Sequence, residues 1–353
     1  MIGPRQVGKT TLIKNIIDRS SDVLFLDGDD PLIREALVDV GTEKLRQIIG
    51  NAKVVFIDEA QRITNIGLTL KIIHDQFPEV QLYASGSSAL DLNQKINEPL
   101  TGRKWEYRLF PISWKELQDD TNNYLKTLQQ LEQRLIYGMY PDVVNNIGDE
   151  KDILKQLTSS YLYKDILGYE GMRKPEILDS LLRALAFQLG NEVSYNELSK
   201  LIGVDKKTIQ NYINLLEKTF VIYRLAPFSR NLRNEIKTTR KIYFYDNGVR
   251  NALISNFNSL EFRQDKGALW ENFLMTERMK QNEYQDRSVS SFFWRTKQQQ
   301  EIDLIEERDG KLYAYEFKYP NNKTTKPPIT FTNAYPDTEY LVIDHDNFID
   351  FVS

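Results

Sequence analysis

Residues 3–10, GPRQVGKT, match the phosphate-loop pattern G-x-x-x-x-G-K-[ST]. Gly3 and Gly8 allow the backbone to wrap around phosphates, and the helix predicted to follow would offer them its free N–H groups. Lys9 can reach the terminal phosphates, and Thr10 can ligate Mg²⁺. The predicted nucleotide-binding residues of this segment are Gly3, Gly8, Lys9, Thr10 and Thr11. Average residue usage produces the pattern by chance in roughly one chain in a hundred of this length, so a second element is required.

That second element is the segment KVVFIDEA at residues 53–60, in which four apolar residues precede paired acids. The pattern predicts a buried parallel strand that delivers carboxylates at its C-terminal edge. Asp58 is expected to hold Mg²⁺ and Glu59 to polarise the attacking water, because phosphoryl transfer needs a positioned nucleophile and charge neutralisation. Paired acids alone would more often mark a solvated strand end, but together with the loop they favour a site for ATP and Mg²⁺.

Two further runs predict strands of the same sheet, VLFLD at residues 23–27 and VQLYASGSS at residues 80–88. The second run ends in hydroxyls, and Ser85 is the candidate sensor of the γ-phosphate. Arg103 follows in the segment TGRKWEYRLF. It either acts as an arginine finger on the ATP of a neighbouring subunit, which requires a homo-oligomer, or pairs with an acid on the surface. Both alternatives are open at this point.

These residues together resemble the AAA-type ATPases of bacteria and archaea, in which a GPRQVGKTTL loop, an IDEAQ strand, an SGSS strand and a GR…PISW segment follow in this order. The resemblance covers most of the chain and implies an α/β P-loop ATPase with a parallel sheet. Only Met1 and Ile2 precede Gly3, so the strand that should lead into the loop is missing from the pattern. We expect the true start to lie upstream; the alternative is a domain that lacks a central strand and binds nucleotide poorly.

A helix-turn-helix is predicted between residues 192 and 225, with Ser194 and Asp205 capping two amphipathic helices. The β-type residues that follow favour a winged form. Residues 201–250 carry ten Lys or Arg against four Asp or Glu, in a chain of net charge -4. The predicted contacts to nucleic acid, with DNA as the expected partner, are Lys206, Lys207, Arg230 and Arg233. A protein-interaction module and a merely solvated basic face are the alternatives.

The C-terminal part contains two strand-like runs, residues 301–308 and 311–319, that flank the hairpin dipeptide Asp309-Gly310. The register of a two-residue hairpin places Asp303 opposite Glu316, and it places Glu301 opposite Lys318. All four side chains would then share one face of the hairpin.

The packing of the two hairpin faces follows from the same register. Ile305 and Ala314 are expected on the carboxylate face, and Ile302 and Leu304 on the other face. Two opposed carboxylates repel, so a cation bound between them is expected. The alternative is an ordinary Glu–Lys salt bridge with Asp303 turned toward solvent, which leaves the opposed carboxylates unexplained.

The arrangement Asp303…Glu316-x-Lys318 resembles the PD-(D/E)xK core of restriction-endonuclease-like enzymes, with Glu271 on the helix predicted at residues 267–281. The resemblance implies that Asp303 and Glu316 hold Mg²⁺ and that Lys318 activates water and stabilises the transition state. It also implies that Glu271 completes the metal shell or positions water. Proteins that join this type of ATPase to a nuclease-like domain form a recognisable bacterial group.

A chain of 353 residues is expected to form two or three domains. The predicted order is an AAA-type ATPase domain at 1–120, a helical connector at 121–190, a winged-helix-like region at 191–240 and a PD-(D/E)xK nuclease-like α/β domain at 241–353. The absence of cysteine, with only two histidines, excludes disulfides and thiolate or multi-histidine zinc sites. No long apolar run or signal-peptide core is present, so a cytoplasmic location without a membrane partner is expected.

The predicted function is ATP binding and hydrolysis by a protein that acts on nucleic acid and carries a Mg²⁺-dependent nuclease-like site. One alternative is an ATP-switched DNA- or protein-binding module without nuclease activity. Another is an assembly scaffold whose ATPase controls the oligomer and whose winged helix contacts proteins. The predicted catalytic residues are Glu59, Arg103, Glu271, Asp303, Glu316 and Lys318.

Overall fold

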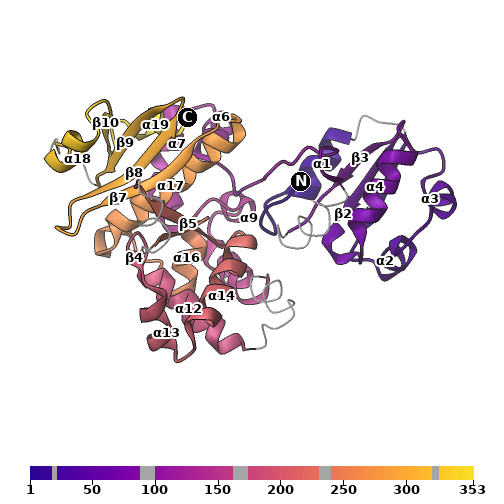
Figure 1. Cartoon of the computed structure of the whole chain (residues 1–353), viewed down its shortest axis with the longest axis horizontal. Coiled ribbons are helices and arrows are strands. Elements are labelled where there is room, and N and C mark those ends of the chain that lie inside the picture. The colour runs from indigo at the N-terminus through magenta and orange to yellow at the C-terminus, as the bar shows by residue number, and fades with distance from the viewer. Residues whose placement is uncertain (18–21, 88–99, 162–173, 230–239, 320–325) are drawn as a thin grey trace. The chain divides into compact units, whose positions relative to one another are not determined.

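The computed structural model describes residues 1–17, 22–87, 100–161, 174–229, 240–319 and 326–353 (Figure 1). The chain forms two compact units. The first contains Met1–Phe110 and Lys218–Phe220, and the second contains Pro111–Glu217 and Val221–Ser353. The break after Phe110 lies near the end predicted for the ATPase domain. No helix within the described ranges is long and apolar enough to cross a membrane.

The first unit is built on a parallel sheet of order β1-β2-β3. Its elements are β1 (Val23–Asp27), β2 (Val54–Asp58), β3 (Gln81–Ala84), α1 (Lys9–Ile17), α2 (Pro31–Leu37), α3 (Thr42–Ile49), η1 (Ala60–Arg62) and α4 (Ile66–Gln76). Strand β2 is buried at every position, as its apolar run predicts. Ile13 and Ile17 of α1 pack against Val54 and Phe56, so the helix that follows the phosphate loop is held against the central strand.

The first two residues of the chain extend this sheet. The Met1 nitrogen donates to the carbonyl of Ala84 at 2.7 Å, and Gly86 N–H donates to the carbonyl of Met1 at 3.1 Å. On the other side, Ile2 exchanges backbone hydrogen bonds of 2.9 Å with residues 107 and 109. Ile2 thus forms isolated β-bridges with Gly86 and Arg108 directly before the phosphate loop.

The N-terminal part of the second unit is helical, as predicted for the connector. Its elements are α6 (Trp114–Thr121), α7 (Tyr124–Gln129), α8 (Leu131–Tyr137), α9 (Pro141–Asn145), α10 (Glu150–Gln156), the π-helix η2 (Leu157–Tyr161) and α12 (Pro175–Phe187). Ser113 caps α6 in a capping box with Glu116, which fixes where this helix begins.

Two helices with a tight turn lie where the helix-turn-helix is predicted, α13 (Tyr195–Ile202) and α14 (Lys206–Lys218). Ser194 accepts a hydrogen bond from Glu197 N–H, and Asp205 accepts one from Thr208 N–H, so both predicted caps are present. Short antiparallel strands accompany the helices: β4 (Glu192–Val193), β5 (Ile222–Pro227) and β6 (Arg240–Phe244). The domain boundary predicted between residues 240 and 241 falls inside β6.

These three strands belong to a seven-stranded sheet of order β10-β9-β8-β7-β5-β6-β4. Its other elements are α16 (Asn247–Leu253), η3 (Leu260–Phe262), α17 (Lys266–Tyr284), β7 (Ser290–Arg295), β8 (Glu301–Arg308), β9 (Lys311–Phe317), α18 (Ile329–Ala334), β10 (Glu339–Ile343) and α19 (Phe348–Val352). The long helix α17 runs along the sheet (Figure 1). It is tied to β8 by the ion pair of Arg278 with Glu306 at 2.7 Å.

The β8–β9 hairpin has the predicted register from Arg308 opposite Lys311 to Leu304 opposite Tyr315. Asp309 and Gly310 both have positive φ, 52° and 73°, as a type I′ turn requires. The regular alternation stops beyond Leu304.

A β-bulge changes the faces at this point. Phe292 of β7 pairs with Ile305 and Trp294 pairs with Ile302, so β8 contains one extra residue between the two pairs. Ile302 therefore joins the hydrophobic cluster of Ile305 and Ala314. The predicted assignment of Ile302 to the opposite face is wrong because it extended a uniform alternation through the bulge.

Candidate functional site

The phosphate loop of the first unit is tightly built. A Cβ atom at Gly3 would lie 2.0 Å from the carbonyl oxygen of Leu109, so only glycine fits at this position. Gly8 has a φ of 92°, which also favours glycine. Lys9 is 5% exposed, and its ammonium donates to the carbonyls of Gly3 (3.0 Å) and Pro4 (2.6 Å). The loop thus holds a positive charge against its own first residues.

Three predicted residues from three separate elements meet at one carboxylate. Thr10 Oγ1 donates to Asp58 Oδ2 at 2.6 Å, and Ser85 Oγ donates to Asp58 Oδ1. Asp58 is 7% exposed and Ser85 is fully buried. The Thr10 hydroxyl and the Asp58 carboxylate are hard oxygen donors, and Mg²⁺ in nucleotide sites uses one or two such protein ligands together with phosphates. The residues present fit a Mg²⁺–nucleotide complex.

Glu59 follows Asp58 with a φ of 46°, an uncommon left-handed backbone for this residue type. A Cβ atom at Gly28 would lie 2.5 Å from the carbonyl oxygen of Glu59, so only glycine fits at position 28, where the backbone approaches Glu59. The Glu59 carboxylate accepts a hydrogen bond of 2.6 Å from Gln61 Nε2, and Gln61 also donates to Ser87. Gln61 was not singled out by the sequence motifs.

Arg103 lies in the first unit and pairs with Asp75, with 3.3 Å between its Nε and Asp75 Oδ1. The guanidinium side chain is 43% exposed. This is the surface pair that one alternative predicted. A role on the ATP of a neighbouring subunit stays a prediction, and it would require this exposed pair to open.

The basic region around α14 is smaller than its composition indicates. Lys206 and Lys207 are exposed at the start of α14. Arg224, however, forms an ion pair with Glu217, and Lys241 is buried. The predicted contacts Arg230 and Arg233 lie outside the described residues.

The second unit contains an acidic cluster around Lys241 of β6. Its ammonium lies 2.9 Å from Glu271 Oε1 of α17 and 3.7 Å from Asp303 Oδ1 of β8, and it also pairs with Glu301. The Lys241 side chain is 1% exposed. Tyr243, two residues along β6, donates its hydroxyl to the same Oε1 of Glu271 at 2.6 Å. Sequence analysis missed both residues, although a lysine and a tyrosine at alternate positions of an apolar strand mark a shared face.

The two carboxylates predicted to oppose each other each have an ammonium nearby. Lys318 pairs with Glu316 at 2.5 Å, whereas Lys241 neighbours Asp303. The alternative of a Glu301–Lys318 salt bridge is wrong, because Glu301 pairs with Lys241 and Arg295 instead. The alternative with Asp303 facing solvent is also wrong, because Asp303 is 9% exposed.

Burial dominates the electrostatics of this cluster. It raises the pKa of Asp303 to about 7, with the charge of Glu271 adding to the rise and Lys241 opposing it. Burial, followed by the charge of Asp303, raises the pKa of Glu316 to about 7. Burial alone would lower the pKa of Lys241, but Glu271, Asp303 and Glu301 outweigh it and raise that pKa. Lys241 therefore stays charged and supplies the positive charge that the carboxylates require.

The ammonium of Lys241 competes with the predicted Mg²⁺ ion for the carboxylates of this cluster. Mg²⁺ needs near-octahedral oxygen ligands at about 2.0–2.1 Å. Within the described ranges, no three His, Cys, Asp or Glu side chains are disposed to hold a metal ion. The cation predicted between Asp303 and Glu316 stays a prediction; in the structure the Lys241 ammonium lies beside Asp303 and Lys318 pairs with Glu316.

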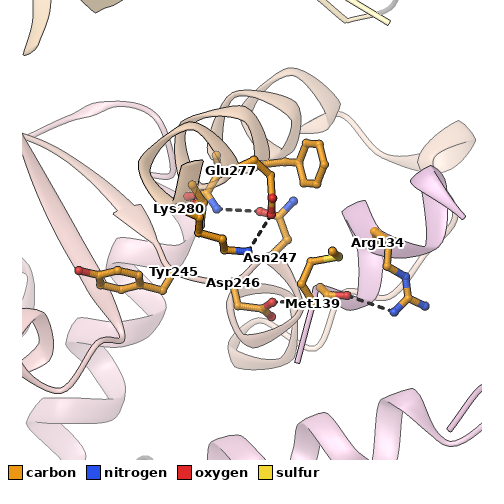
Figure 2. Close-up of a pocket in the computed structure, with 11 residues that line it drawn as sticks. Arg134, Met139, Tyr245, Asp246, Asn247, Glu277 and Lys280 are labelled. Carbon is orange, nitrogen blue, oxygen red and sulfur yellow. Dashed lines mark hydrogen bonds and ion pairs between the residues drawn. The ribbon is translucent and has the colours of Figure 1, made fainter. Parts of the chain in front are cut away.

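A small polar cavity lies elsewhere in the second unit, among residues of α8, α17 and the start of α16 (Figure 2). Asp246 Oδ2 accepts a hydrogen bond from Met139 N–H at 2.6 Å, and Lys280 pairs with Glu277 at 2.7 Å. Its volume is about 10 Å³, which is room for roughly one water molecule. The cavity is therefore a structural feature rather than a substrate site.

Comparison with known proteins assigns the parts of the chain. Residues 1–118 match the model of an AAA domain. Residues 128–260 and 266–352 match two domains of unknown function, DUF8612 and DUF4143. The N-terminal third of the chain, which contains the phosphate loop, is thus similar to AAA domains.

Relatives match over most of the chain. An uncharacterized protein of Mycobacterium tuberculosis is 27% identical over 337 residues, covering 94% of this chain and 71% of its own. An uncharacterized protein of Methanocaldococcus jannaschii is 23% identical over 349 residues, covering 91% and 75%. Among solved structures, AMPPCP-bound DnaA from Aquifex aeolicus is 16% identical, with a TM-score of 0.28 over 61% of this chain and 80% of that one. That TM-score is too low to define a shared fold.

Proposed function

We propose that this chain is an ATP-hydrolysing AAA protein that binds nucleic acid under the control of its nucleotide state, and that its C-terminal domain binds without cutting. The observation that supports hydrolysis is the convergence of Thr10 and Ser85 on Asp58, with Glu59 as the next residue. The observation that argues against cutting is the Lys241 ammonium among Glu271, Glu301 and Asp303.

In this proposal, each residue of the nucleotide site has a separate role in hydrolysis. Thr10 and Asp58 would hold Mg²⁺, which when bound neutralises charge on the phosphates. Lys9 would turn from the carbonyls of its own loop to the terminal phosphates. Glu59 would polarise the attacking water, and Ser85, bonded to Asp58, would respond to the state of the metal site.

The helix-turn-helix is the proposed nucleic-acid contact. The order of α13 and α14 followed by the β5–β6 pair supports a winged-helix interpretation. Lys206 and Lys207 stand exposed at the N-terminus of α14, where their positive charge suits a phosphate backbone. The buried Lys241 and the paired Arg224 contribute nothing to this surface.

A second candidate function, metal-dependent nucleic-acid cleavage, is favoured by one observation. Asp303 and Glu316 interact electrostatically, and Lys318 interacts with Glu271, Asp303 and Glu316, as in a PD-(D/E)xK site. Cleavage through Mg²⁺ would require the Lys241 ammonium to leave the carboxylates. The loss of its three partners inside a buried site makes that movement costly.

The experiment that tests the proposal is DNA binding followed by fluorescence anisotropy with ATP, ADP or no nucleotide, across a salt series. We expect nucleotide-dependent affinity, and we expect the Lys206→Ala/Lys207→Ala variant to flatten the log–log salt slope by about 2. The Lys9→Ala variant should lose the nucleotide dependence and keep basal binding. Binding that is absent at low salt, or indifferent to nucleotide, would reject the proposal.

A further inference from the structure

Gln61 connects the proposed water-polarising residue to the end of the third strand. Its Nε2 donates to Glu59 Oε2 at 2.6 Å and to Ser87 Oγ at 3.1 Å. Gln61 is 9% exposed and Ser87 is 4% exposed, so bulk water does not compete for these bonds. Because a carboxylate only accepts hydrogen bonds, the NH₂ end of the amide is the end that faces Glu59.

The other end of the same amide has no partner. Gln61 Oε1 is buried and accepts no hydrogen bond from any described residue. A buried acceptor without a donor destabilises the fold, and glutamines kept for structure normally use both ends. The NH₂ group of the amide makes the hydrogen bonds that hold the side chain, whereas its carbonyl oxygen has no donor.

The backbone near Glu59 is fixed, whereas its carboxylate depends on Gln61. Ala60 N–H donates to the carbonyl of Ser85 at 2.9 Å, which ties the left-handed turn at Glu59 to the third strand. Among the described residues, Gln61 supplies the only side-chain hydrogen bond to the Glu59 carboxylate. Without it, the carboxylate would be free to rotate among rotamers.

We propose that Gln61 is a positioning residue for ATP hydrolysis. It directs the Glu59 carboxylate toward the attacking water and links that direction to Ser87. This inference rests on the proposed hydrolysis at Glu59, so its test has to separate the two.

Three variants and the wild-type chain provide the test: Gln61→Met, which keeps length without hydrogen bonds, Gln61→Glu, which keeps shape and replaces the donor by a charge, and Glu59→Gln. ATP turnover, equilibrium binding of a fluorescent ATP analogue with Mg²⁺, and Tm are measured for each. We expect Gln61→Met to lower kcat about 10- to 100-fold with nucleotide Kd changed less than about twofold and Tm not lowered. In Gln61→Glu the new carboxylate cannot donate to Glu59, so we expect kcat to fall at least as far as in Gln61→Met.

The outcomes separate the claims. Wild-type turnover in Glu59→Gln would reject hydrolysis at Glu59 itself. An inactive Glu59→Gln together with full kcat in Gln61→Met would reject positioning by Gln61 and leave the proposed function standing. A fall of Tm in parallel with kcat in Gln61→Met would assign Gln61 a structural role and would also overturn the proposal. A Glu59→Gln/Gln61→Met double variant no slower than Glu59→Gln alone would support it.

Discussion

Lys241 Nζ lies 2.9 Å from Oε1 of Glu271, and this contact between β6 and α17 decides how the C-terminal acidic cluster is interpreted. The lysine side chain is 1% exposed and Glu271 is 15% exposed, so the pair is largely removed from solvent. A buried ammonium with three carboxylate neighbours fulfils the charge-balancing role that a metal ion would have there.

Replacing Lys241 should destabilise the second unit strongly. Lys241→Met removes the ammonium nearest to the Glu271 and Asp303 carboxylates, so we expect a loss of about 3–5 kcal/mol in the free energy of unfolding. Urea denaturation measures this. Lys207→Met, at an exposed position, is the control and should change stability by less than about 0.5 kcal/mol. Equal effects of the two substitutions would show that Lys241 is not balancing the cluster.

The stability of the second unit should fall as pH rises toward neutrality. Asp303 and Glu316 have pKa values raised to about 7 in the folded chain, whereas ordinary unfolded values are about 4. Between these values the folded state binds more protons than the unfolded state, so stability decreases from about pH 4 to about pH 7 and levels off above. Thermal unfolding from pH 5 to pH 8 tests this. Asp303→Asn should flatten the slope, and an unchanged slope in that variant would contradict the shift assigned to Asp303.

Gly138 should be intolerant of any side chain. A Cβ atom there would lie 2.1 Å from Asp246 Oδ1, the carboxylate that caps α16, and the φ of Gly138 is 76°. Gly203 has a nearly identical φ of 77° with nothing within 4 Å of a Cβ atom. We expect Gly203→Ala to show the backbone strain alone, about 1–2 kcal/mol, and Gly138→Ala to lose a further 1–3 kcal/mol, roughly, from the clash. Chemical denaturation of both variants gives the difference, and equal losses would contradict the close contact with Asp246.

Asp58 should control the Mg²⁺ dependence of nucleotide binding. Thr10 and Ser85 both donate to its carboxylate, so Asp58→Asn removes the charge while keeping similar shape. We expect ATP affinity in the variant to be nearly the same with Mg²⁺ and with EDTA, and turnover to fall by about 10²-fold or more. Calorimetric titration of ATP under both conditions checks this. Retained Mg²⁺ enhancement in Asp58→Asn would place the metal ligands elsewhere.

Local signals predicted the parts of the structure that depend on neighbouring residues. Asp309-Gly310 set the register of the β8–β9 hairpin correctly as far as Leu304, because a two-residue turn determines pairing by geometry. The spacing of Lys9 and Thr10 after Gly8, with the apolar run before Asp58, likewise predicted side chains that meet in space.

Tertiary arrangement determined what local signals could not. The bulge in β8 arises from pairing with β7, which no motif specifies, and it moved Ile302 to the other face. Lys241 counted as surface charge in the sequence because its partners Glu271, Glu301 and Asp303 come from other elements. Gln61 was overlooked because its role depends on contacts with Glu59 and Ser87 rather than on spacing.

The most direct test of the account is a nuclease assay on the wild-type chain. Linear, supercoiled and single-stranded DNA are incubated with Mg²⁺ or Mn²⁺, with and without ATP, alongside the Asp303→Ala and Lys318→Ala variants. We predict ATP hydrolysis and nucleotide-dependent DNA binding without cleavage in any condition. Cleavage by the wild-type chain that disappears in both variants would contradict the account and establish the cluster around Lys241 as a nuclease site.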